Sequence, residues 1–126
     1  MAQWAPLGQG NVDLRRIVGI LAEKAPAAPV DLEIITCIPP KLIDYWSPTS
    51  DFWRMYPGML AQDFARFVKL AESGKPGQLE QEMIPPGTRG VPEGDAGERL
   101  IDQQRLHFEE SVRYARGVLG LGERGR

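Results

Sequence analysis

Residues 7–36 have the sequence LGQGNVDLRRIVGILAEKAPAAPVDLEIIT, and this stretch decides the expected fold. Over residues 12–25 the apolar side chains recur at the spacing of three, four and seven that marks one face of a helix. Asn11 or Asp13 is available as the N-cap, because a short polar side chain there can accept from a free backbone N–H. The first half of the stretch therefore predicts an amphipathic helix.

The second half predicts a strand. Pro26 and Pro29 end the helix, because proline has no backbone N–H and biases the preceding residue towards an extended conformation. Residues 30–37, VDLEIITC, are rich in β-branched side chains and are short enough for a strand covered on both faces. Helix, proline turn and buried strand together form one α-to-β step.

The remainder of the chain predicts two more helices. Residues 39–58 crowd aromatic side chains among prolines, which is typical of a structured loop, and helical periods return over residues 60–72 and 98–119. The predicted organisation is a helix–strand–helix step with an aromatic loop over residues 1–73, a Gly/Pro-rich loop over residues 74–97, and a C-terminal helix and tail over residues 98–126.

A lone strand is incomplete, because its backbone groups need neighbouring strands. Two alternatives follow. Either the strand is misread and the protein is a small helical domain, or the neighbouring strands lie on another segment or subunit. We favour the second alternative.

Composition limits the partners. Fifteen basic and 17 acidic residues give a net charge of -2, so the chain has no excess positive charge to attract nucleic acid. No apolar run approaches the roughly 18 residues of a membrane span, and no leader pattern opens the sequence. The single cysteine, Cys37, excludes an internal disulfide framework and favours the reducing cytoplasm.

Residues 7–36 resemble the closing repeat of the xylose isomerase-like TIM barrels, which include sugar phosphate isomerases, ketose epimerases and endonuclease IV. In that family a glycine-bearing loop leads through a helix to an eighth strand that ends in a glutamate. Residues 51–74 and 114–121 are similar to the tail of one branch of these proteins. The resemblance implies an α/β fold: a C-terminal fragment of a TIM (β/α)8 barrel, mostly helical with one strand. The matching positions are Gly8, Gly10, Val12, Asp13, Leu32 and Glu33.

The resemblance assigns Glu33 as a metal ligand and a catalytic residue. In the family this glutamate binds a divalent metal (Mn, Co, Mg or Zn) together with a glutamate, an aspartate and a histidine from earlier strands. The chain offers no such set, and its sole histidine, His107, falls in the predicted terminal helix, where we expect a surface or half-buried residue. We therefore expect this chain alone to lack a complete metal site and to be inactive.

Lys41, Trp46 and Trp53 are the candidate substrate-binding residues, because they follow the predicted strand, where a barrel places groups that cover a sugar. The alternative, that the aromatic residues pack the loop onto a rim or an interface, is favoured on residue type alone. Gly8 and Gly10 could likewise cradle a phosphate, but a sharp turn into the helix explains them better.

Two functions remain open. The first is the C-terminal portion of a divalent-metal-dependent sugar or sugar phosphate isomerase/epimerase-like protein of carbohydrate metabolism, cytoplasmic, with an undetermined substrate. Lyase activity stays open, and endonuclease activity ranks lowest because a basic surface is lacking. The second is a non-catalytic helical module that binds a partner. Either would associate with itself or with a complementary barrel segment. Cys37 is expected to be a small core residue.

Overall fold

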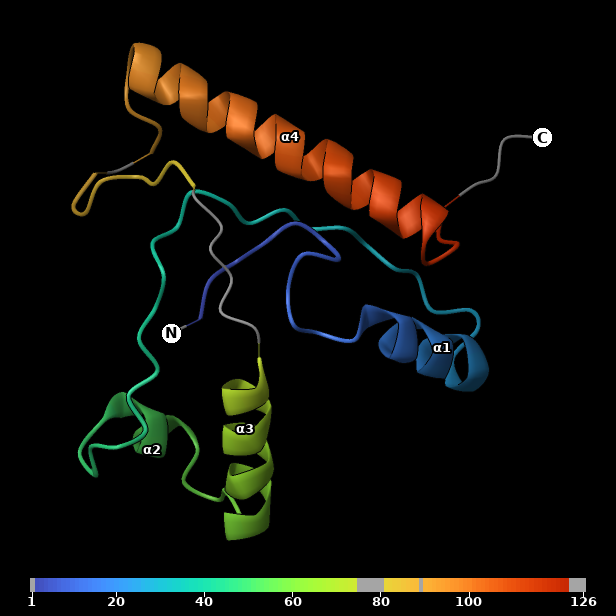
Figure 1. Ribbon diagram of the computed structural model, residues 1–126, viewed down its shortest axis with the longest axis vertical. Coiled ribbons are helices and arrows are strands. Elements are labelled where there is room, and N and C mark those ends of the chain that lie inside the picture. The colour runs from blue at the N-terminus through green and yellow to red at the C-terminus, as the bar shows by residue number, and fades with distance from the viewer. Residues whose placement is uncertain (1, 75–80, 89, 123–126) are drawn as a thin grey trace. The chain divides into compact units, whose positions relative to one another are not determined.

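The computed structural model describes residues 2–74, 81–88 and 90–122. These residues form four helices: α1 (Leu14–Lys24), α2 (Asp51–Met55), α3 (Ala61–Ser73) and α4 (Asp95–Gly117) (Figure 1). The chain divides into two compact units. Unit 1 consists of Met1–Gln3 and Pro40–Gln78, and unit 2 of Trp4–Pro39 and Leu79–Arg126.

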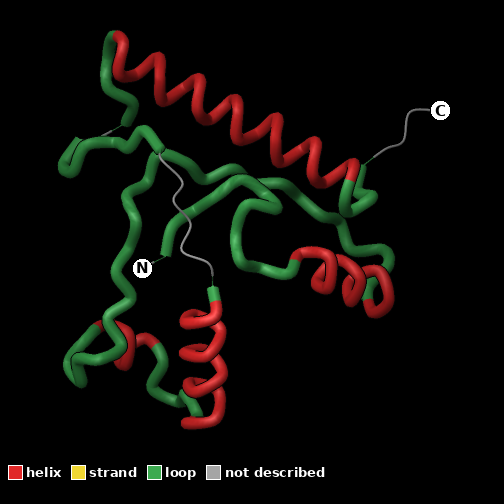
Figure 2. The backbone as a smooth tube through the Cα atoms, in the orientation of Figure 1, coloured by secondary structure: helices red, strands yellow, loops and turns green. Residues whose placement is uncertain are grey.

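The predicted strand is wrong, and with it the fold class. Residues 30–36 form neither helix nor strand and Cys37 lies in a bend, and the described part of the chain contains no sheet and no barrel (Figure 2). Its one β-type pairing is an isolated antiparallel bridge between Ala2 and Lys41. Residues 29–36 make no backbone hydrogen bond to any described residue. The β-branched run favours an extended backbone, but without a neighbouring strand it cannot form a ladder.

The three predicted helices are confirmed within a few residues as α1, α3 and α4. Of the two N-cap candidates for α1, Asp13 is the one that caps, because its Oδ1 accepts from the N–H of Arg16 at 3.0 Å. The short helix α2 was missed, since its five residues lie in the expected aromatic loop and are too few to show a helical period. Residues 75–80 and 89 of the predicted Gly/Pro-rich loop, and residues 123–126 of the tail, lie outside the described residues.

Unit 1 is held by aromatic packing. The ring of Phe52 in α2 lies 5.0–6.2 Å, centroid to centroid, from five other aromatic rings. Edge-on and tilted arrangements dominate, as the quadrupoles of aromatic rings favour. The rings around Phe52 are those of Tyr45, Trp53, Tyr56, Phe64 and Phe67.

Unit 2 is organised by α4, a helix of 23 residues. Extended segments pass along one side of it (Figure 1), and polar contacts join them to that side. Every buried residue of the described chain belongs to this unit. The buried hydrophobic core consists of Cys37 at 5% exposure and Leu100 at 4%. The buried set is Pro6, Cys37, Gly97, Leu100, His107 and Ser111.

The turn at Gly8 requires glycine. Its φ of +86° lies in the left-handed region, and a Cβ at this position would overlap the ring of Tyr114. Gly10 has no such requirement, because a Cβ there meets nothing within 4 Å. The sequence left two interpretations of these glycines, a phosphate cradle and a sharp turn into the helix. The geometry at Gly8 supplies a structural reason for the sharp turn.

We expect Gly8→Ala to lower the free energy of unfolding by about 1–3 kcal/mol, because the substitution combines backbone strain with a clash. Gly10→Ala is the matched control and should change it by less than about 0.5 kcal/mol. Urea unfolding followed by circular dichroism measures both. Equal stability of the two variants would contradict the turn geometry described here.

Candidate functional site

Three polar side chains form a ladder along the face of α4 that contacts the other segments of unit 2. Gln103, His107 and Ser111 are each four residues apart, so they lie one above another on the helix. Together they contact three other segments of unit 2, and Gln103 and His107 share Thr36 as a partner. Ser111, fully buried at 0% exposure, accepts at its Oγ from the backbone N–H of Leu7 at 3.0 Å.

Gln103 is the best-connected member of this polar ladder. Its Oε1 accepts from the backbone N–H of Glu82 at 2.7 Å, and its Nε2 lies 3.0 Å from the carbonyl oxygen of the same residue. The Nε2 group also donates towards Thr36 Oγ1 at 3.1 Å and Cys37 Sγ at 3.2 Å. One amide therefore fixes two segments that are distant in sequence.

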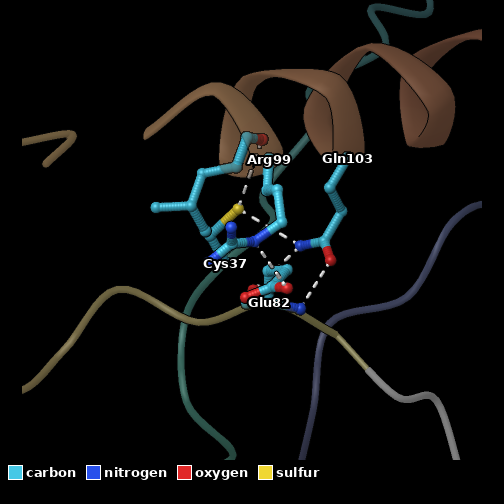
Figure 3. A network of polar contacts seen from close by, with 5 residues as sticks. Cys37, Glu82, Arg99 and Gln103 are labelled. Carbon is cyan, nitrogen blue, oxygen red and sulfur yellow. Dashed lines mark hydrogen bonds and ion pairs between the residues drawn. The ribbon is translucent and has the colours of Figure 1, made fainter. Parts of the chain in front are cut away.

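Figure 3 shows the polar network around Gln103, which includes Cys37, Glu82 and Arg99. Arg99, one turn earlier in α4, donates from Nε to Glu82 Oε1 at 3.1 Å. Cys37 is buried and has a φ of 64°, an unusual value for a residue with a side chain. Its thiol contacts the carbonyl oxygen of Leu100 at 3.7 Å. The prediction that Cys37 is a small core residue is confirmed.

His107 is buried at 8% exposure, so the prediction of a surface or half-buried residue is wrong. Its Nδ1 lies 2.8 Å from Thr36 Oγ1. Burial lowers the pKa of His107, because desolvation penalises the charged ring, and the nearby carboxylate of Glu110 partly offsets this effect. A neutral ring can accept the hydroxyl proton of Thr36, whose oxygen already accepts from Gln103.

Glu33 stands on the extended segment of unit 2 and is exposed. No hydrogen bond or ion pair joins its carboxylate to a described residue. Among the residues that the structure describes, no three His, Cys, Asp or Glu side chains gather as metal ligands would. The donor set that the described chain offers around Glu33 does not fit a divalent metal by itself.

The three predicted substrate-binding residues all belong to unit 1. Lys41 lines a cavity of about 860 Å³, a volume within the range of small-molecule sites. Trp53 donates from its indole N–H to the carbonyl of Tyr45 at 3.2 Å, whereas Trp46 is 70% exposed and stacks on the Tyr45 ring at 4.0 Å.

That cavity has mixed walls. Its apolar side is formed by the aromatic packing of unit 1 and by two methionines, and its polar side carries Lys41, two aspartates and three serine or threonine hydroxyl groups. The hydroxyl of Ser50 is buried and has no hydrogen-bond partner among the described residues. The lining residues include Lys41, Ile43, Asp44, Ser47, Thr49, Ser50, Asp51, Phe52, Met55, Tyr56, Met59 and Phe67.

The polar ladder was missed by sequence reasoning, which attended to the apolar register of this helix. A signal was present, since Gln103, His107 and Ser111 repeat every fourth position beside Leu100. Polar residues in line with a buried apolar residue indicate a helix face that satisfies backbone groups rather than one that faces solvent.

No helix in the described ranges is long and apolar enough to cross a membrane.

We expect acidification through the region below pH 6.5, the ordinary pKa of histidine, to destabilise unit 2. Because the folded state lowers the pKa of His107, the unfolded chain binds the proton more readily in this window, and stability rises with pH across it. Urea unfolding at about pH 7.5 and about pH 5.5 measures the change. His107→Gln should flatten this dependence, and an unchanged slope in that variant would rule out His107 as its source.

Comparisons with known proteins add no family to these observations. No protein-family model matches the chain, and no curated protein and no solved structure matches it. The resemblance of residues 7–36 to the xylose isomerase-like proteins therefore stays a prediction.

Proposed function

We propose that this chain is one part of a divalent-metal-dependent sugar or sugar phosphate isomerase/epimerase-like protein, to which it supplies Glu33. The resemblance of residues 7–36 supports the class of reaction. One structural observation supports the role of Glu33: its carboxylate is exposed and without an ion pair, on a segment whose backbone groups are unpaired within the described chain. Such a segment is free to join further polypeptide.

The chain alone is inactive under this proposal. A divalent metal in such sites takes several oxygen and nitrogen ligands, and a single exposed carboxylate binds it weakly. The remaining ligands come from further polypeptide. Glu33 would be one ligand of such a metal, which would supply Lewis-acid polarisation of the sugar oxygens, and the same carboxylate would be available for proton transfer.

Lys41 is the residue of unit 1 that best fits an anionic substrate. It lies at the cavity wall, and no ion pair joins its ammonium group to a described residue. A phosphate would supply the missing charge partner, and exposed rings such as Trp46 provide faces on which a sugar can stack. A cytoplasmic location belongs to the same proposal, because the buried thiol of Cys37 has no disulfide partner in the chain.

The second candidate is a non-catalytic helical module that binds a partner. Large apolar side chains are exposed on the helices, among them Ile17 and Ile20 of α1 at 45% and 49% exposure, and Leu70 of α3 at 72%. Helices with apolar faces of this kind favour a covering partner. This candidate needs no metal and no role for Glu33.

The test uses the protein isolated with its natural associates, through an affinity tag at its native locus. We expect sugar or sugar phosphate interconversion that requires Mn, Co, Mg or Zn. Glu33→Gln should lower turnover by about a hundredfold to ten-thousandfold, the range for losing a group that takes part in proton transfer. Glu23→Gln is the control, because Glu23 is exposed in α1 and its one ion pair among the described residues is with the neighbouring Lys24.

Full activity of Glu33→Gln would refute the role of Glu33. Absence of metal-dependent turnover in the isolated assembly, together with an associated protein that is retained in both glutamate variants, would favour the non-catalytic module instead.

A further inference from the structure

The cavity of unit 1 has an apolar wall that includes Leu42, Met55, Tyr56 and Phe67. Much of this wall faces solvent, because Leu42, Met55 and Tyr56 are 62%, 61% and 47% exposed. Covering such surface with another apolar group is favourable, since it removes apolar area from water. The volume of about 860 Å³ leaves room for a small molecule. The apolar wall therefore favours a ligand with an apolar body.

Three charged side chains line the cavity, namely Lys41, Asp44 and Asp51. Asp44 Oδ1 accepts from the backbone N–H groups of Trp46 and Ser47 at 3.2 and 3.1 Å. Asp51 Oδ1 forms an ion pair with Arg54 at 2.8 Å. Both carboxylates of the lining therefore already have donors within the chain.

Lys41 differs from the two aspartates. Its backbone is held by two hydrogen bonds to Ala2, each 2.8 Å long, so the position of the residue at the cavity is fixed. No ion pair joins its ammonium group to a described residue. Because the ammonium group is a compact cation, an anionic group on a ligand would supply its partner.

The serine and threonine hydroxyls of the lining also divide into paired and unpaired groups. Ser47 Oγ and Thr49 Oγ1 lie 3.1 Å apart and bond to each other. The Ser50 hydroxyl is buried without a hydrogen-bond partner among the described residues, which costs free energy. A carboxylate accepts hydrogen bonds from both hydroxyl and ammonium groups. Ser50 and Lys41 thus call for the same ligand group.

We propose that the cavity of unit 1 binds a small apolar carboxylic acid in its ionised form. The carboxylate bonds to Lys41 and Ser50, and the apolar body covers the apolar wall. A sugar phosphate also carries an anion for Lys41, but its hydroxyl groups would lose water against that wall. The inference goes beyond the proposed function and does not rest on Glu33, which belongs to unit 2.

Isothermal titration calorimetry of the full chain tests the site, with hexanoate, octanoate and decanoate as probes. Each added CH₂ group should tighten binding by about fourfold, because it buries more apolar surface. No binding of decanoate, or an affinity that does not rise with chain length, would overturn the proposal.

Lys41→Met tests the contact with the carboxylate. The variant should bind octanoate roughly threefold to tenfold more weakly, because the ion pair is lost, and should bind octanol as the unmodified chain does. Lys69→Met is the matched control, since Lys69 is exposed in α3 and does not line the cavity. Equal loss of octanoate binding in the two lysine variants would show that Lys41 does not hold the carboxylate.

Met55→Glu tests the apolar wall. It should weaken octanoate binding by roughly tenfold or more, because it places a charge where the apolar body lies. Leu70→Glu adds the same charge to α3 at a position that is 72% exposed and outside the lining, and it should leave binding unchanged. Circular dichroism checks that both variants keep their helices. Equal effects of the two substitutions would place octanoate elsewhere on the chain.

Glucose 6-phosphate is the competing probe. It should not displace octanoate at equal concentration. Tighter binding of glucose 6-phosphate than of octanoate, lost in Lys41→Met, would overturn the apolar carboxylate and support a sugar phosphate at Lys41 instead. The calorimetry needs no turnover, so its outcome is independent of the test of Glu33.

Discussion

Unit 2 depends on the polar ladder of α4. Its three side chains form hydrogen bonds to three segments that form no sheet with one another. Gln103 bonds to Glu82, His107 to Thr36, and Ser111 to Leu7. A hydrogen bond contributes about 1 kcal/mol net, whereas ordering one residue costs about 1–2 kcal/mol. A few such bonds and the buried Leu100 therefore leave unit 2 with little surplus stability. This shortage is the physical reason to expect further polypeptide on its open surfaces.

Unit 1 is held by a different force. Its aromatic rings pack against Phe52, and each pair contributes about 0.5–1.5 kcal/mol beyond the area it buries. This packing also shapes the cavity that Lys41 lines. The aromatic residues of the loop therefore have a packing role whether or not a sugar binds there. Trp46 is the most exposed of them, and Tyr56, which is also exposed, lines the cavity.

The sequence predicted the parts of the fold that depend on local pattern. Periodic apolar positions located α1, α3 and α4, and Asp13 marked the start of α1. The strand failed because a β-branched run sets only local backbone preference, while a ladder needs a neighbour that the described chain does not provide. The site was harder to foresee. Ser111 and Leu7 are 104 positions apart, so no local sequence pattern predicts their contact. Glu33 was expected on a covered strand but is exposed.

In unit 2, residues 30–36 hold backbone groups without partners in the described chain, while α4 anchors the unit. Hydrogen exchange of the isolated chain, followed by mass spectrometry, tests it most directly. We predict that amides of residues 30–36 exchange at nearly the rate of an unstructured peptide, while those in the middle of α4 exchange most slowly. Protection of residues 30–36 as strong as that of α4 would mean instead that these residues are paired in a sheet.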